Sequence, residues 1–438
     1  MTLPAPVPRD RGVVVDDRLP AVRALLGPEA AAALAPAVAA DGGRIRSLRP
    51  RLVNYWPGDA IRISYDAHVE FSDHAEPLTL VAGATATGTR EGEIEAHAAG
   101  MPIDVWRVPD DPRLPGLRHA LDRVFVSELL DSLGISSASF EIRLMSYSPR
   151  SRAMVEVSYA PPNTLVFRPG EGVGRASPRP LLYLKVMRPE RAAAVRNTHE
   201  VLGATVPIAT CSVERDDIGL LGFQPMSGRT LWDELTAGAP VPGADDLLAL
   251  LERFEGAEIG EAGRAPIRKT VRYNAETLAA TVPDRAAVID RFLEALGDAP
   301  EQPRVTIHGD FHEMQVLTAA GRIAALLDMD DAGTGERMDD FAMLLGRLWC
   351  FGQTEPDPDG RVAAYTESLL RGFSELVDAR ELRIRMAAVA MNHATGHFRF
   401  QHRGWPQLTR EAIDRADRLL ASTATLGGGP PALPDEAA

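Results

Sequence analysis

A short stretch of the chain places acidic and imidazole side chains directly after a strand-like run. His308, Asp310 and His312 alternate along the loop that follows the apolar residues 305–307. A carboxylate in such a loop can accept a proton from a hydroxyl group, or orient that hydroxyl for attack. A zinc-dependent hydrolase would need further His or Cys ligands at close spacing, and the next histidine along the chain is His393. The spacing therefore favours Asp310 as a proton-handling acid over a hydrolytic metal cluster.

Oxygen ligands for a divalent ion follow within twenty residues. Gln315 stands five residues after Asp310, and a second strand-like run, 322–327, leads into Asp328. We expect this run to form a hairpin with 305–307, which would bring Asp310, Gln315 and Asp328 together at one end. Carboxylate and amide oxygens suit Mg²⁺, which proteins hold with few side chains plus substrate phosphates. A hydroxyl-orienting acid beside such an ion is the minimum that phosphoryl transfer requires.

The whole pattern resembles the aminoglycoside phosphotransferase and choline kinase-like family, small-molecule relatives of the protein kinases. The family pattern is HGDxHxxN, then an Asp, then GDPxxDLA; this chain has HGDFHEMQ at 308–315, Asp328, and GERMDDFA at 335–342. Gln315 stands where Asn is usual, and it keeps the amide oxygen with one more methylene. The third element departs from the family in the pair after its glycine, at the entry to a helix. Four spaced elements within about 35 residues make the resemblance specific.

The resemblance extends upstream of this stretch. LLYLKVMRPE at 181–190 resembles the third strand of the family, whose lysine, here Lys185, holds the nucleotide phosphates. Residues 206–235 resemble the run that crosses the hinge between the two lobes, which places the adenine edge near Gln224 and Met226. The kinase-like resemblance thus covers about 140–425.

The family resemblance implies a set of site residues. It assigns catalytic roles to Asp310, His308 and His312, magnesium binding to Gln315 and Asp328, nucleotide binding to Lys185, Gln224 and Met226, and a structural role in bracing the catalytic loop to Asp340, with His308 also bracing. Asp330 and Asp331 are interpreted as supporting or solvent-facing. The implied cofactors are ATP or GTP and Mg²⁺, and the implied partner is a hydroxyl of an antibiotic, sugar, amino alcohol or other metabolite. The alternative is a pseudokinase that serves as a binding or scaffold module.

The sequence does not identify which helix residue pairs with Lys185. The family pairs this lysine with a Glu about 15 residues downstream, and Glu200 has that spacing from Lys185. In a helix that begins after Pro189, however, Glu200 falls opposite the apolar stripe. Glu190 lies nearer the stripe but at the helix start.

The elements that must position these residues divide into a strand-rich front and a helix-rich back. The front contains an internal repeat: 51–65 and 143–159 both show Arg-Leu-x-x-Tyr-x-Pro, turn residues, and an alternating strand ending in Ser-Tyr. Each predicts a hairpin, followed by a further strand at 77–83 or 180–186. The second copy carries the lysine, and its counterpart in the first is near Val81. The first copy is therefore interpreted as a degenerate duplicate of the front lobe.

The back shows apolar residues at helical spacing. It predicts helices at 244–259, 268–281, 284–297, 338–352, 360–378, 380–400 and 408–423. The pattern is that of an α+β, two-lobe protein-kinase-like fold with an additional N-terminal β-rich domain. We expect the following division: 1–20 flexible, 21–122 the N-terminal β-rich domain, 123–226 the nucleotide-binding lobe, 227–424 the helical catalytic lobe, and 425–438 a disordered tail.

Two loops in the front half are candidates for contact with phosphates. From the comparison of the two copies of the repeat, the turn 148–152 is the loop that would cover the nucleotide phosphates. Its Arg150 and Arg152 either approach those phosphates or are solvated. Gly170, Gly172 and Gly174 are interpreted as part of a flexible surface connection instead.

Composition narrows the class of protein. The 438 residues include 47 Lys and Arg against 61 Asp and Glu, a net charge of −14, which disfavours non-specific binding to nucleic acid or an anionic membrane. Two cysteines cannot form a disulfide framework. Residues 1–10 lack the pattern of a secretory signal, and the longest apolar stretch, 29–40, is too short to span a bilayer. We expect a cytoplasmic protein.

Overall fold

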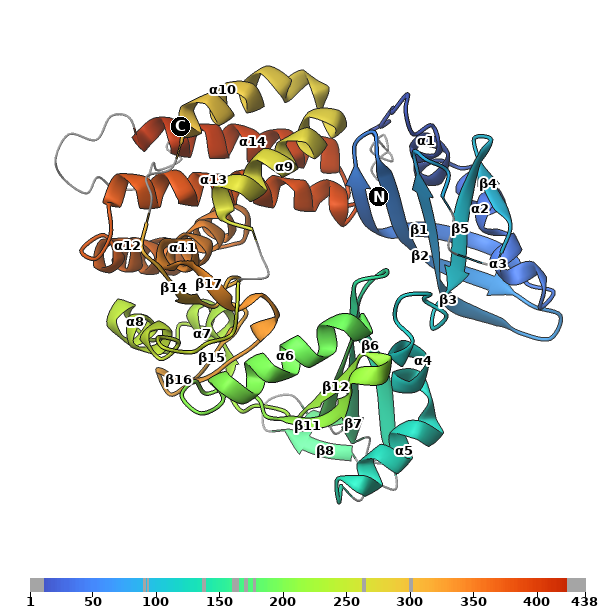
Figure 1. The fold of residues 1–438 in the computed structure, drawn as a ribbon, viewed down its shortest axis with the longest axis horizontal. Coiled ribbons are helices and arrows are strands. Elements are labelled where there is room, and N and C mark those ends of the chain that lie inside the picture. The colour runs from blue at the N-terminus through green and yellow to red at the C-terminus, as the bar shows by residue number, and fades with distance from the viewer. Residues whose placement is uncertain are drawn as a thin grey trace.

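The structure, a computed structural model, describes residues 12–89, 92, 94–135, 139–159, 165–168, 172–175, 179–261, 265–298 and 302–423. Two sheet-containing regions are followed by a mostly helical region (Figure 1). The predicted α+β fold, with a strand-rich front and a helix-rich back, is confirmed. No helix within these ranges is both long and apolar enough to cross a membrane.

The first sheet is antiparallel, with the strand order β1-β2-β3-β5-β4. Short helices precede it and follow it. The elements of this region are α1 Ala21–Leu26, α2 Ala30–Leu34, α3 Pro36–Ala39, β1 Arg44–Trp56, β2 Ala60–Glu70, β3 Ala75–Thr85, β4 Ala96–Ala98 and β5 Met101–Arg107. The helices that follow, α4 Gly116–Leu121 and α5 Arg123–Ser132, pack against the second sheet. Alternation in β2 buries Ile61, Ile63 and Tyr65 on one face, as a period of two requires.

The second sheet repeats this topology. Its elements are β6 Phe140–Ser148, β7 Arg152–Tyr159, β10 Arg179–Met187, α6 Pro189–Leu202, β11 Cys211–Arg215 and β12 Leu220–Phe223. The order is β6-β7-β10-β12-β11, so in both sheets the last strand inserts between the third strand and the edge strand. Both hairpins of the sequence repeat are confirmed. The common order supports the idea of a duplication, which stays a prediction.

The two sheets differ at two connections. In the second, α6 joins β10 to β11, whereas the described residues between β3 and β4 form no helix. The connection from β7 to β10 contains a separate hairpin, β8 Leu165–Arg168 and β9 Gly172–Arg175. Gly170 lies outside the described residues.

The third region combines helices with short strands. Its elements are β13 Arg229–Thr230, α7 Leu231–Thr236, α8 Ala244–Glu252, α9 Ile267–Thr281, α10 Ala286–Leu296, β14 Arg304–Ile307, β15 Val316–Ala319, β16 Arg322–Leu326, β17 Gly333–Glu336, α11 Arg337–Thr354, α12 Arg361–Phe373, α13 Ala379–Arg399 and α14 Trp405–Ser422. Every helix predicted for the back is found, with ends that differ by up to seven residues, whereas α7 was not predicted. Spacing near 3.6 turns Phe341, Leu345 and Leu348 of α11 inward, and Phe341 stacks on Phe373 with ring centroids 4.2 Å apart.

The predicted hairpin between 305–307 and 322–327 is wrong. β14 pairs with β17, and β16 pairs with β15. The reason is the tight turn at Ala320 and Gly321, both at positive φ (51° and 75°), which makes β15 and β16 a hairpin of their own. Asp310 therefore follows β14, and Asp328 follows β16, in two separate small sheets.

Candidate active site

The ammonium group of Lys185 meets two carboxylates from the helical region. Its Nζ donates to Asp328 Oδ1 at 2.7 Å and to Asp330 Oδ1 at 2.6 Å. Lys185 comes from β10, in the centre of the second sheet, and the two acids lie in the one-turn helix after β16. The side chain of Lys185 is 6% exposed, so this is a buried ion cluster that joins the front and back regions.

The charges of this cluster stabilise one another. Burial lowers the pKa of Lys185, but Asp330 and Asp328 outweigh that effect, so its pKa is raised. Burial raises the pKa of Asp328, but Lys185 and Arg152 hold it well below its usual range. Both groups are therefore charged at neutral pH. Asp328 itself has a φ of 60°, an uncommon conformation outside glycine that often accompanies functional sites.

The loop of Asp310 is held by Asp340 from the first turn of α11. The backbone N–H groups of His308 and Gly309 donate to the two carboxylate oxygens of Asp340 at 3.0 and 2.9 Å. His308 is fully buried, and its Nε2 lies 2.9 Å from the carbonyl oxygen of Leu327. Its Nδ1 accepts from the backbone N–H of Asp310 at 3.2 Å. These bonds tie the loop to the strand that delivers Asp328.

Glycine is required at position 309. Its φ is +83°, and an added Cβ would lie 2.3 Å from the carbonyl oxygen of Asp331. The loop of Asp310 thus approaches the turn after Asp328 more closely than a side chain would permit.

His312 and Glu313, later in the same loop, have partners of their own. The Nε2 of His312 lies 3.9 Å from Asp310 Oδ2, and its Nδ1 accepts from the backbone N–H of Met314 at 3.2 Å. Glu313 is fully buried and pairs with Arg347 of α11 at 2.7 Å. Glu313 was not predicted as a site residue, because an acid next to the motif has no distinguishing spacing.

Gln315 lies beside the backbone that leads into Asp328. The backbone carbonyl oxygen of Gln315 accepts from the backbone N–H of Leu327 at 2.9 Å, and the backbone N–H of Gln315 donates to the carbonyl oxygen of His312. The structure thus brings Gln315 next to the approach to Asp328, although the strands involved differ from those predicted.

Neither candidate glutamate of α6 lies at Lys185. Glu200 is exposed and lies 3.9 Å from Arg196, and Glu190 is exposed near Arg188. The Glu200 side chain faces away, as its position on the helix predicted. The second acid at Lys185 is Asp330, not a glutamate of α6. The position of Asp330 two residues after Asp328 is plain in the sequence, but the direction of its side chain is not.

The proposed adenine contacts lie directly after β12. Gln224 is exposed, and Met226 is half-buried against an apolar cluster that includes Met187, Leu221 and Phe223. This cluster lies on the strands that flank Lys185.

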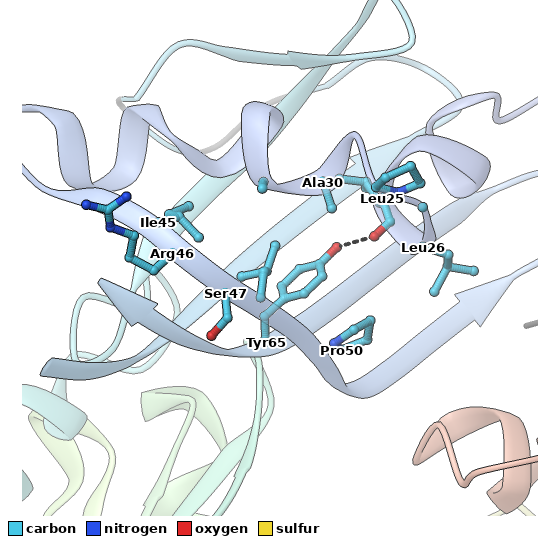
Figure 2. Close-up of a pocket in the computed structure, with 12 residues that line it drawn as sticks. Leu25, Leu26, Ala30, Ile45, Arg46, Ser47, Pro50 and Tyr65 are labelled. Atoms are coloured by element: carbon cyan, nitrogen blue, oxygen red, sulfur yellow. Dashed lines mark hydrogen bonds between the residues drawn. The ribbon is translucent and has the colours of Figure 1, made fainter. Parts of the chain in front are cut away.

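One cavity lies in the first sheet and another lies beside the loop of Asp310. One, of about 160 Å³, lies under α1 and α2 in the first sheet; Figure 2 shows Tyr65 directed at the carbonyl oxygen of Leu25, to which its hydroxyl donates at 2.8 Å. Its lining, from residues 25–65, includes none of the predicted site residues. A second cavity, of about 380 Å³, touches Gly309 of the catalytic loop and the start of α9 and α11.

Residues 178–376 match the model of the APH family, described as the phosphotransferase enzyme family. This matched segment covers 199 of the 438 residues, less than half of the chain. It contains Lys185, the loop of Asp310, and Asp328. The family resemblance inferred from the motifs is confirmed, whereas the match does not reach the first sheet.

Solved structures of antibiotic phosphotransferases also align with the chain. They include a thermostable mutant of aminoglycoside phosphotransferase APH(4)-Ia with ADP and hygromycin B (16% identity, 67% of this chain and 97% of that one, TM-score 0.43). Others are macrolide 2'-phosphotransferase MphH from Brachybacterium faecium (14%, 66% and 97%, 0.41) and the GDP complex of aminoglycoside 2'-phosphotransferase-IIIa (12%, 68% and 99%, 0.42). Among curated proteins, none matches this chain.

Proposed function

We propose that this protein transfers the γ-phosphoryl group of ATP or GTP to a hydroxyl of a small molecule. The observation that supports this most is the ion cluster of Lys185 with Asp328 and Asp330. A buried ammonium and two carboxylates from opposite regions are what a metal–nucleotide complex needs: oxygens for the ion and a cation for the phosphates. A protein that only needed stability would gain little from such a buried cluster.

Mg²⁺ is the cofactor that these residues fit. Asp328 is ionised at neutral pH, Asp330 adds a second carboxylate at Lys185, and Gln315, whose backbone bonds the approach to Asp328, would add an amide oxygen. Magnesium is usually held by one or two carboxylates, water and substrate phosphates, so this small set is sufficient. When bound, the ion would offset the charge that develops on the transferred phosphoryl group.

Each side chain of the site then has a separate role in the transfer. Asp310 orients the acceptor hydroxyl and takes its proton as the bond to phosphorus forms and the bond to the leaving nucleoside diphosphate breaks. Lys185, released from its carboxylates, donates to the phosphates. Asp340 and His308 hold the loop so that Asp310 keeps its place.

The acceptor is proposed to bind in the cavity beside Gly309. Its lining contains both acids and bases, and Glu261 pairs with Arg304. The other charged lining residues are Lys269, Glu336 and Asp339. Because these charges largely offset one another, the cavity suits a polar, hydroxylated molecule without a strong demand for a particular net charge.

The test is nucleotide consumption with a library of antibiotics, sugars, amino alcohols and other metabolites, using Asp310→Asn as the blank. We expect at least one acceptor to raise ATP or GTP turnover well above that blank. A pseudokinase would bind nucleotide without acceptor-dependent turnover. A wild-type protein that neither binds nor consumes nucleotide, with or without Mg²⁺, would refute the proposal.

A further inference from the structure

The turn between β6 and β7 is held against the first sheet. Nη2 of Arg150, at its tip, donates to Asp104 Oδ2 at 2.6 Å, and the two side chains are 12% and 6% exposed. The backbone N–H of Arg150 donates to Asp111 at 2.7 Å. The side chain of Arg150 therefore binds the first sheet, and it is neither solvated nor directed at the phosphate site.

A buried hydrogen-bonded chain reinforces this contact. The hydroxyl of Tyr147, near the end of β6, donates to Asp111 at 2.6 Å and accepts from Trp106 Nε1 at 3.0 Å. Burial and then Asp111 raise the pKa of Tyr147 far above its usual range. The guanidinium of Arg150 also lies 5.2 Å from the ring centroid of Trp106, within the range of a cation–π contact. Buried hydrogen-bonded networks of this kind favour one geometry.

Two residues beyond Arg150, the same turn delivers a second arginine to the ion cluster. Arg152 begins β7 opposite Met187, and Met154 lies opposite Lys185, so Arg152 and Lys185 share one face of the sheet. Its Nη1 lies 3.7 Å from Asp328 and 3.6 Å from Asp330. Burial lowers the pKa of Arg152, but Asp328, Asp330 and the neighbouring acids outweigh it.

We propose that Arg152 binds the nucleotide phosphates, and that the first sheet positions it there through Arg150. The inference rests on the proposed function. Lys185 already faces two carboxylates, and a triphosphate adds several negative charges. Arg152 supplies a second cation, with a fork that matches phosphate oxygens. Its side chain is 46% exposed, so it can turn from the carboxylates to an entering ligand. The N-terminal β-rich region thereby acts on nucleotide affinity from outside the phosphotransferase-family segment.

The direct test is Mg-ATP binding by calorimetry. We expect Arg152→Gln to weaken the affinity about 10- to 100-fold, the range for a lost hydrogen bond to a charged group, and Arg152→Lys to restore part of it. Arg179→Gln is the matched control, because Arg179 is exposed at the opposite end of the same strand ladder and its loss should leave affinity unchanged. An affinity of Arg152→Gln equal to that of the wild type would overturn the inference.

The positioning role is tested by a double-mutant cycle. Asp104→Asn is combined with Arg152→Gln, and Mg-ATP affinity is measured in all four proteins. We expect Asp104→Asn to weaken binding when Arg152 is present and to have little further effect when it is absent. Equal effects in both backgrounds would mean that the first sheet acts by general destabilisation, and would overturn the positioning role.

Two safeguards keep the result interpretable. If Asp104→Asn lowers the melting temperature strongly, Asp104→Asn with Arg150→Met removes both partners and leaves no unpaired buried charge; the same cycle is then run on that pair. If the wild type binds Mg-ATP but the Arg152 variants bind equally well, only this inference fails. If the wild type does not bind nucleotide, the proposed function fails first.

Discussion

At the scale of single residues, the pairing of Lys185 with Asp328 and Asp330 sets the charge of the site before a nucleotide arrives. The same carboxylates serve as partners for the lysine in the free protein and, in the proposed function, as ligands for the ion. Entry of a metal–nucleotide complex would therefore exchange one set of ion pairs for another. Such an exchange avoids leaving a buried charge without a partner at either stage.

Asp328→Asn is expected to abolish the dependence of nucleotide affinity on Mg²⁺, because an amide is a poor substitute for a carboxylate that balances a divalent ion. Calorimetry with ATP at several Mg²⁺ concentrations measures this directly. Asp217→Asn, at an exposed ion pair with Arg215, is the control and should behave as the wild type. A Mg²⁺ dependence unchanged in Asp328→Asn would exclude Asp328 as a metal ligand.

Asp310→Asn is expected to lower kcat by about 10²- to 10⁴-fold, the usual contribution of a positioned acid or base. Mg-ATP affinity should change little, because Asp310 acts on the acceptor and the amide preserves its shape. Steady-state kinetics with an identified acceptor, together with calorimetry, separates the two effects. Turnover equal to that of the wild type would remove Asp310 from the mechanism.

At the scale of elements, α13 carries a pair of half-buried histidines. Burial lowers the pKa of both His393 and His397 to about 4, assisted by His402 and, for His393, first by Arg347 of α11, with Arg415 of α14 as a further positive neighbour. The folded protein therefore keeps both rings neutral at pH values where the unfolded chain would protonate them.

This pair predicts a loss of stability in mild acid. A folded pKa below the unfolded value of 6.5 gives stability that is complete above about pH 6.5 and is lost as pH falls towards 4. Urea unfolding at several pH values between 7.5 and 4.5 should show the free energy of unfolding falling. His393→Asn should flatten that fall relative to the wild type; a variant with the same slope would contradict the assignment.

At the scale of the whole molecule, the first sheet touches both regions that form the site (Figure 1). Towards the helices, Thr277 of α9 donates to the carbonyl oxygen of Tyr55 at 3.3 Å, and the ring of Tyr55 lies 6.2 Å from that of Phe398. Towards the second sheet, it holds Arg150 through Asp104. The N-terminal region thus contacts both the second sheet and the helical region.

A second long-range element of stability lies under the cavity beside Gly309. Arg385 is 2% exposed and pairs with Glu381, Asp339 and Glu336 at 2.9, 2.7 and 2.5 Å, which joins α13, α11 and β17. Arg385→Met should lower the free energy of unfolding by about 3–5 kcal/mol, because it removes the cation that pairs with Asp339 and Glu336, whereas Glu381 keeps its pair with Arg268. Urea unfolding measures this, with the exposed Arg380→Met on the same helix as control. A loss as small as that of the control would show that these acids are solvated or protonated at no cost.

Local patterns predicted the elements well. The repeat around 51–65 and 143–159 predicted both hairpins, and helical spacing predicted the back, because side-chain periodicity follows directly from backbone geometry. Pairing between 305–307 and 322–327 was predicted wrongly, because the turn at Ala320 lacks the Asn-Gly or Asp-Gly signal of a tight hairpin. The choice of strand partner is a long-range property that alternation alone does not encode.

The sequence by itself determined which chemistry is present: the motif around Asp310, Asp328 and Lys185 resembles that of a phosphotransferase family, whose model matches residues 178–376. Residue types and spacing in a loop are local properties. Only the tertiary structure decided what surrounds that chemistry. It turned Asp330 towards Lys185, took Arg150 into the first sheet and brought Arg152 to the acids. These outcomes depend on contacts between segments up to about two hundred residues apart, whose free energy is decided by how the whole chain packs.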